Sequence, residues 1–336
     1  MGVFNLKRFN AIAAMALGAT MVIAAPAVAA DQYDVVFGKN KDWLFTGYEY
    51  LTPADEASIN QSVNNLIRAS QLFRQKGTAL AIVIVPSKIR VYENELPASR
   101  PFTPFAGQVY GKAVTALRAG GVNVVDLATP FAAAPDKAGA NQLFYKLDTH
   151  WTPKGAMLAA ETIKSTVMAT PELKAAWEKA PAVQYNLNWA ARPRPSRARD
   201  LVHYLPPGTA TFAPEQILTF TTARTTPATA SLTGAGERVA VTTIGSSFSD
   251  PNTGYPNAVR YALQRNVLEM SLPVDQGPWY GMANYLANEY KTAKPDLIIW
   301  EIPEREFRAP PAATWREARF RIDNAAWLSR MEQLLK

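Results

Sequence analysis

The chain has no cysteine and only two histidines, His150 and His203, among its 336 residues. The lack of cysteine excludes a disulfide framework and a thiolate metal site. With no third histidine or cysteine to complete a ligand set, we predict no metal centre. If the chain carries a catalytic imidazole, it has to be one of these two side chains.

Long apolar runs are also absent, except at the N-terminus. Residues 1–30 have a basic start at Lys7 and Arg8, an apolar stretch at 11–28 and a small-x-small cleavage pattern at 27–29. We predict a secretory signal and a periplasmic location. The alternative is an uncleaved anchor in the inner membrane, although eighteen apolar residues reach only the lower end of a membrane span.

The mature chain, residues 31–336, keeps a positive charge. The formal net charge of the whole sequence is +7, and removing Lys7 and Arg8 with the signal leaves +5. A positive surface suits an acidic polymer such as a uronate polysaccharide, and it is equally compatible with ordinary surface charge. No nucleic-acid-binding motif occurs, so we expect no nucleic acid as partner.

Apolar strands alternate with amphipathic helices along most of the chain. Strands are predicted at 79–85, 122–127, 238–244, 267–270 and 297–300, and helices at 54–76, 108–117, 153–168, 171–179, 257–264, 282–291 and 325–335. This alternation predicts an α/β fold in which helices cover both faces of a mostly parallel sheet. Residues 184–236, rich in Arg, Pro and Thr, break the rhythm and are predicted to be an irregular insertion within one domain.

Two short motifs contain the residues of a serine nucleophile and its base. Ser247, in Gly-Ser-Ser, follows a predicted strand, and reactive groups in parallel sheets collect beyond the carboxyl ends of strands. Asp148 and His150 lie at i and i+2, so in an extended segment the carboxylate can hold Nδ1 and leave Nε2 for the serine. Taken alone, the Gly-Ser-Ser motif also fits a plain turn, and Asp-x-His also fits a capped turn before the helix at Pro153.

Further blocks accompany these motifs over most of the mature chain. They are Asp42-Trp43-Leu44-Phe45, Val85-Pro86-Ser87-Lys88, Asp148-Thr149-His150-Trp151, Gly245-Ser246-Ser247-Phe248-Ser249 and Trp300-Glu301-Ile302-Pro303-Glu304-Arg305. In this order they resemble the SGNH hydrolase-like alginate O-acetyltransferases of the AlgJ/AlgX type. Most SGNH enzymes place the serine before the Asp/His pair, so the order here resembles a circularly permuted version.

The resemblance implies a three-layer α/β/α SGNH-like domain that acetylates an exopolysaccharide, alginate-like or cellulose-like, without cofactor or metal. Ser247 would be the nucleophile, with its N–H toward the oxyanion, His150 the base and Asp148 the orienting acid; Ser246 is the competing serine. The expected partners are the polysaccharide, a membrane-bound O-acyltransferase that supplies acetyl groups, and other export proteins. An acetyl esterase with the same triad and a non-catalytic polysaccharide-binding scaffold remain the alternatives.

Four further residues are weaker candidates for substrate or oxyanion contacts. Tyr280 is a candidate hydrogen-bond donor and Trp279 a candidate platform for a sugar ring, although the two also fit a buried aromatic pair. Arg305 is a candidate ligand for a polymer carboxylate, or a structural partner of Glu301. Lys88 follows the first strand of the sheet and is predicted to line the mouth of the cleft.

Overall fold

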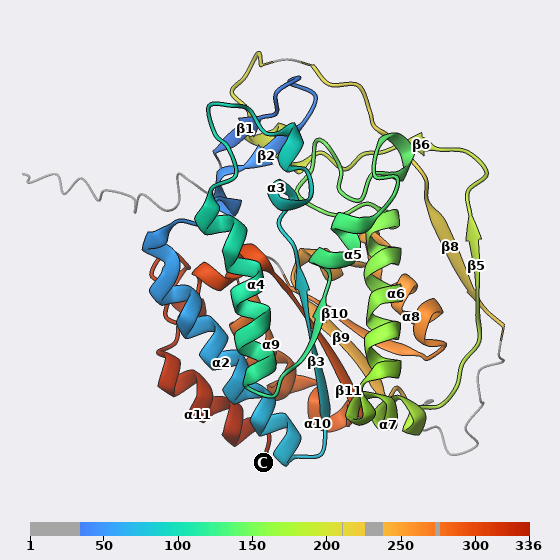
Figure 1. Cartoon of the computed structure of the whole chain (residues 1–336). Helices are drawn as coiled ribbons and strands as arrows, with labels where there is room; N and C mark the ends of the chain where they lie inside the picture. Colours follow the sequence, from blue (N-terminus) through green and yellow to red (C-terminus); the bar gives the residue numbers. More distant parts are fainter. Residues whose placement is uncertain (1–33, 210, 226–237, 273–275) are drawn as a thin grey trace, which may run out of the picture.

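The structure is a computed structural model that describes residues 34–209, 211–225, 238–272 and 276–336 (Figure 1). The predicted signal sequence at 1–30 lies outside the described residues, as do residue 210 and residues 226–236 of the predicted insertion. Within the described ranges, no helix is both long and apolar enough for a membrane span.

A parallel sheet of five strands forms the centre of the fold, in the order β10-β9-β11-β3-β4. The strands are β3 (Ala79–Val85), β4 (Asn123–Asp126), β9 (Val241–Gly245), β10 (Val267–Ser271) and β11 (Leu297–Pro303). Every residue of β3 and β11 is buried, as expected for middle strands covered on both faces. The predicted parallel sheet is confirmed.

The sheet separates two hydrophobic cores. Ala81 and Val83 of β3 belong to one core, and Ile82 and Ile84 belong to the other, because successive side chains of a strand point to opposite faces. One face is covered by α6 (Pro153–Ala169), α7 (Pro171–Lys179) and α8 (Tyr255–Leu263). The other is covered by α2 (Glu56–Gln75), α4 (Pro104–Ala119), α9 (Gly277–Asn288) and α11 (Asn324–Leu334) (Figure 1).

Smaller elements surround the three layers. They are β1 (Val35–Phe37), β2 (Leu44–Thr46), α3 (Lys88–Val91), α5 (Ala128–Ala133) and α10 (Tyr290–Ala293). The described part of the predicted insertion contains β5 (Tyr185–Trp189), β6 (Arg194–Pro195), β7 (Gln216–Ile217) and β8 (Phe220–Arg224). These four strands pair as β5–β8 and β6–β7, outside the central sheet.

The first turn of α6 is pressed against the chain that precedes it. The helix cap is Thr152, whose side chain accepts from the Gly155 N–H and donates to the carbonyl of Gln142. The Thr152 N–H donates to the carbonyl of Leu143 at 2.9 Å. A Cβ built on Gly155 would overlap that same Leu143 carbonyl. The contact therefore fixes the position of residues 148–151, which directly precede the cap of α6.

Replacing Gly155 with alanine is expected to destabilise the protein by about 1–3 kcal/mol, because the added methyl group meets backbone that cannot yield locally. Gly111 is the matched control, since a Cβ built there in α4 meets no atom within 4 Å. Gly111→Ala should stabilise the protein by about 0.5–1 kcal/mol through helix propensity. Urea unfolding of both variants tests this, and equal free energies of unfolding would contradict the close contact.

Candidate active site

Ser247 lies just beyond the carboxyl end of β9, where the chain turns into a short 3₁₀ helix at Ser247–Ser249. Its side chain is partly exposed, whereas its neighbours Ser246 and Phe248 are buried. The tight turn requires Gly245, because a Cβ at that position would overlap the carboxylate of Glu301 and the hydroxyl of Ser249. The turn therefore presents one hydroxyl to the edge of the sheet.

His150 stands between Asp148 and Ser247. Its Nδ1 lies 2.7 Å from Asp148 Oδ1, and its Nε2 lies 2.7 Å from Ser247 Oγ. The Asp148 carboxylate also accepts the backbone N–H of His150 at 3.0 Å, which fixes the ring relative to its own chain. The ring of Phe248 packs beside the imidazole, with 5.0 Å between ring centroids.

This geometry sets the direction of the hydrogen bonds. An ionised carboxylate only accepts, so Nδ1 of His150 carries the proton and Nε2 is free to accept from the hydroxyl of Ser247. Burial alone would raise the pKa of Asp148, but the hydrogen bond and charge of His150 outweigh it and lower the pKa to about 2. Asp148 therefore stays ionised at neutral pH. The Ser247 N–H donates to no acceptor in the described part of the chain, so it is available to an incoming oxygen.

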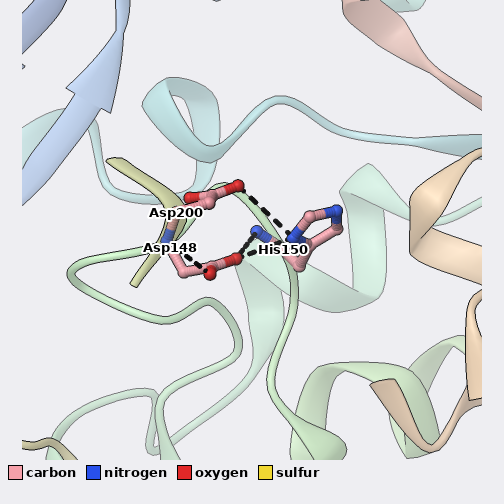
Figure 2. A group of neighbouring side chains, drawn as sticks. All are labelled: Asp148, His150 and Asp200. Carbon is pink, nitrogen blue, oxygen red and sulfur yellow. Dashed lines mark hydrogen bonds and ion pairs between the residues drawn. The ribbon is translucent and has the colours of Figure 1, made fainter. Parts of the chain in front are cut away.

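Asp200 is a second carboxylate at the histidine, and the sequence did not predict it. Figure 2 shows its side chain facing His150 beside Asp148, with Asp200 Oδ2 at 3.6 Å from Nδ1. Asp200 accepts the N–H and the hydroxyl of Thr149, and its own N–H donates to Asp148 Oδ2 at 2.9 Å. Burial, and then the charge of Asp148, raise the pKa of Asp200. No local pattern links residues 52 positions apart in sequence, so this contact could not be predicted.

Asp148, His150 and Asp200 also form a group whose possible metal-ligand atoms all lie within 4.8 Å of one another. However, ligands of a tetrahedral metal ion at about 2.1 Å would lie about 3.4 Å apart. The 2.7 Å between His150 Nδ1 and Asp148 Oδ1 is instead a hydrogen-bond distance. A metal ion there would have to replace the Nδ1 proton and spread the two side chains.

The turn that carries Ser247 rests on a buried carboxyl group. Glu301, two residues before the end of β11, accepts the N–H of Ser246 at 2.9 Å and the hydroxyls of Ser246 and Ser249 at 3.0 Å. Ser246 and Ser249 flank Ser247, so Glu301 holds the turn from below. Burial raises the pKa of Glu301 to about 7, although these hydrogen bonds act against it. The strand predicted at 297–300 stops just before Glu301, and the sequence did not indicate this role.

Lys88 fixes the opposite half of the site. Its Nζ donates to the carbonyls of Leu44, Lys146 and Asp148 at 2.6, 2.9 and 3.0 Å. The side chain is 1% exposed, and burial lowers its pKa to about 8. The prediction that Lys88 lines the mouth of a cleft is therefore wrong. Lys88 points inward and anchors the loop that carries Asp148.

Comparisons with known proteins give the family. The model of the SGNH hydrolase-like domain of acetyltransferase AlgX matches residues 35–304. The chain belongs to this family. It is 30% identical over 284 residues to a probable alginate O-acetylase AlgJ of Pseudomonas putida, covering 81% of this chain and 69% of the relative. The family and this relative identify the chain as an O-acetyltransferase, which confirms the predicted enzyme class.

Solved structures of two relatives have the same fold. One is the O-acetyltransferase domain of Pseudomonas putida AlgJ, with a TM-score of 0.72 and 24% identity over 89% of this chain and 98% of that one. The other is AlgX of Pseudomonas aeruginosa, with a TM-score of 0.62 and 18% identity over 87% of this chain and 72% of that one. The predicted SGNH-like fold is confirmed.

Two aromatic candidates for substrate contact lie elsewhere. Trp279 is 2% exposed, donates from Nε1 to a backbone carbonyl, and packs edge-on against Trp300 and Trp327. A ring enclosed in this way cannot stack on a sugar, so the predicted platform is wrong and the buried alternative is correct. Tyr280 packs against Phe320 at 4.9 Å between ring centroids. No contact of the described residues joins Tyr280 to Ser247, and its oxyanion role stays a prediction.

Arg305 is buried beside the site and does not face solvent. It is 5% exposed, its Nη1 lies 3.4 Å from Glu49 Oε1, and its guanidinium lies 5.4 Å from the centroid of the Phe248 ring. The predicted role as a ligand for a polymer carboxylate is therefore wrong. The structural alternative holds with a different partner, because Arg305 pairs with Glu49 and not with Glu301.

The raised pKa of Glu301 predicts a pH-dependent stability. The folded protein holds this proton more tightly than the unfolded chain does, so the contribution is full below about pH 4.5 and is lost as the pH rises through about 7. Glu301→Gln replaces the titratable carboxyl group with an amide. The free energy of unfolding of this variant should therefore fall less between pH 5 and 8 than that of wild type, by on the order of 2–3 kcal/mol.

Denaturant unfolding at the two pH values measures the difference. Glu161→Gln, at an exposed glutamate of α6, serves as the control and should follow the wild-type pH dependence. If Glu301→Gln also followed the wild-type curve, Glu301 would not be the group that titrates in this range.

Proposed function

We propose that this O-acetyltransferase moves an acetyl group onto hydroxyls of an alginate-like exopolysaccharide through an acyl-enzyme on Ser247. The observation that carries the proposal is the continuous hydrogen-bond chain from Asp148 through His150 to Ser247, with 2.7 Å at each step. The polymer is proposed because the relatives are named alginate O-acetylases and because a positively charged protein suits a uronate chain.

In the first half of the reaction, Ser247 Oγ attacks the carbonyl carbon of an acetyl donor. Its proton passes to His150 Nε2, and Asp148 stabilises the imidazolium that forms. The carbonyl oxygen becomes an oxyanion, toward which the Ser247 N–H is available as a donor. When the tetrahedral intermediate collapses, the imidazolium returns the proton to the leaving oxygen of the donor, and the acetyl group stays on Ser247.

In the second half, a sugar hydroxyl replaces the leaving group. His150 Nε2 accepts the proton of that hydroxyl as its oxygen attacks the acetyl carbon, and the same proton then returns to Ser247 Oγ. The product is an acetyl ester of the sugar, and the enzyme is restored. Water in place of the sugar would give an acetyl esterase with identical residues.

The location and the donor follow from the same proposal. A secretory signal at residues 1–30 would place the enzyme in the periplasm, where acetyl-CoA is absent. The acetyl group would then come from a membrane-bound O-acyltransferase that passes it across the inner membrane. Other proteins of polysaccharide export would present the polymer.

Replacing Ser247 tests the acyl-enzyme. Ser247→Ala should lower kcat/KM for a chromogenic acetyl ester, and for transfer to a mannuronate oligosaccharide, by about 10³-fold or more, because no other serine contacts His150 Nε2 among the described residues. Ser246→Ala is the matched control and should retain the acetyl-enzyme, since the Ser246 hydroxyl points at Glu301. Mass spectrometry of the trapped acetyl-enzyme locates the acetyl group, and acetylation of Ser246 in wild type would overturn the assignment.

The two carboxylates at His150 should contribute differently to kcat. Asp148→Asn should lower kcat by about 10³–10⁴-fold, because the amide no longer holds the proton on Nδ1. Asp200→Asn should lower kcat by about tenfold, because Asp200 reaches His150 only across 3.6 Å and acts mainly through charge. Steady-state hydrolysis of the acetyl ester compares them. A larger loss for Asp200→Asn would make Asp200 the orienting acid.

A further inference from the structure

Three arginines of the insertion lie within the six residues 192–197, shortly before Asp200 in sequence. Arg192, Arg194 and Arg197 are all exposed, and none of their side chains has a hydrogen bond or ion pair with another described residue. We name these three residues the arginine strip. The ten residues 190–199 contain no acidic side chain, so nothing in this stretch offsets their charge.

The strip has a fixed backbone. Arg192 and Arg194 each precede a proline, which biases both arginines toward extended conformations. Arg194 pairs with Ile217 in the β6–β7 ladder, and Ser196, two residues further along, donates its N–H to the carbonyl of Glu215 at 2.8 Å. Because this backbone is already ordered in the folded protein, a ligand that binds the guanidinium groups loses less conformational entropy of the backbone.

The same segment is tied to the loop that carries Asp148. The Glu215 carboxylate accepts the N–H groups of Lys146 and Leu147 at 2.8 and 3.0 Å. On the far side of the strip, the Asp200 N–H donates to Asp148 Oδ2 at 2.9 Å. Because a chain spans at most about 3.6 Å per residue, the Cα of Arg197 lies within about 11 Å of the Cα of Asp200.

An exposed aromatic ring lies on the other side of Asp200. Tyr204 is 47% exposed, whereas no other large hydrophobic side chain among the described residues is exposed. It closes the 3₁₀ helix Asp200–Tyr204, so it lies about 8 Å along the helix axis from Asp200. Along the chain, the arginine strip and an aromatic residue thus stand on either side of Asp200, whose N–H donates to Asp148.

We propose that the arginine strip and Tyr204 form the acceptor-binding surface, and that its ligand is a linear polysaccharide with a carboxylate on its sugar residues. The proposal rests on the proposed transfer to a polysaccharide. Guanidinium groups match carboxylates as paired hydrogen-bond donors, and a tyrosine ring offers an apolar face with a polar tip to a sugar. A strip bonded to the Asp148 loop would hold the polymer with its hydroxyls beside Ser247.

Calorimetry on Ser247→Ala protein tests binding without turnover. The strip variant Arg192→Gln/Arg194→Gln/Arg197→Gln should bind a mannuronate hexasaccharide at least about tenfold more weakly, since it loses three charge-assisted donors. The control Arg68→Gln/Arg118→Gln/Arg330→Gln removes the same charge from exposed arginines of α2, α4 and α11, and should lose less than about twofold. Tyr204→Ala should weaken binding of both mannuronate and cellohexaose, because a sugar face is common to the two.

Equal weakening in the strip and control variants would overturn the proposal, since net charge alone would then explain binding. A strip variant that loses binding to phosphatidylglycerol vesicles but keeps its affinity for mannuronate would overturn it too, and would assign the strip to a membrane surface. In active protein, the ratio of acetyl transfer to ester hydrolysis should fall at least about tenfold in the strip variant. If wild type transfers no acetyl group, the proposed function fails, while calorimetry still decides whether the strip binds.

Discussion

The hydrogen bond between His150 Nε2 and Ser247 Oγ joins two segments that are 97 residues apart, and the proposed chemistry depends on it. One such bond contributes only about 1 kcal/mol, so it cannot itself bring the segments together. Two buried groups do so instead. Lys88 holds the carbonyl of Asp148, and Glu301 holds the turn around Ser247. Lys88 begins α3, three residues after β3 ends, and Glu301 lies in β11. Because β3 and β11 are neighbours in the sheet, both halves of the site are positioned by one pair of buried strands.

This arrangement opposes stability. Burial lowers the pKa of Lys88 to about 8 and raises that of Glu301 to about 7, which means that the fold disfavours the charge on each. Apolar side chains of similar size would often make such positions more stable. They would also leave the carbonyls around Lys88 and the donors around Glu301 without partners, and the loop and the turn would no longer be held in register. Lys88 and Glu301 therefore lower the stability of the fold, and in return they position the loop of Asp148 and the turn of Ser247.

The sequence predicted the scaffold because periodicity reports burial directly. The run at 79–85 was predicted as a strand and forms β3, and Asp148, His150 and Ser247 do come together at the edge of the sheet. The errors arose where neighbouring residues in the sequence did not indicate whether a side chain is buried. Lys88 follows a strand end, yet it turns into the protein, and Trp279 lies in a core built from distant helices. Asp200 could not be predicted, since only the folded insertion brings it to His150.

The insertion is where transfer and hydrolysis can be separated. Asp148, His150 and Ser247 would serve a sugar hydroxyl and a water molecule equally, because the proton path is the same for both. Preference for the sugar must come from groups that raise its local concentration and orient it, as well as from exclusion of water. Residues 184–209 and 211–225 lie outside the central sheet, yet this segment contacts Asp148 through Asp200. Changes in that segment can therefore alter the surroundings of Asp148 and His150 without disturbing the strands of the central sheet.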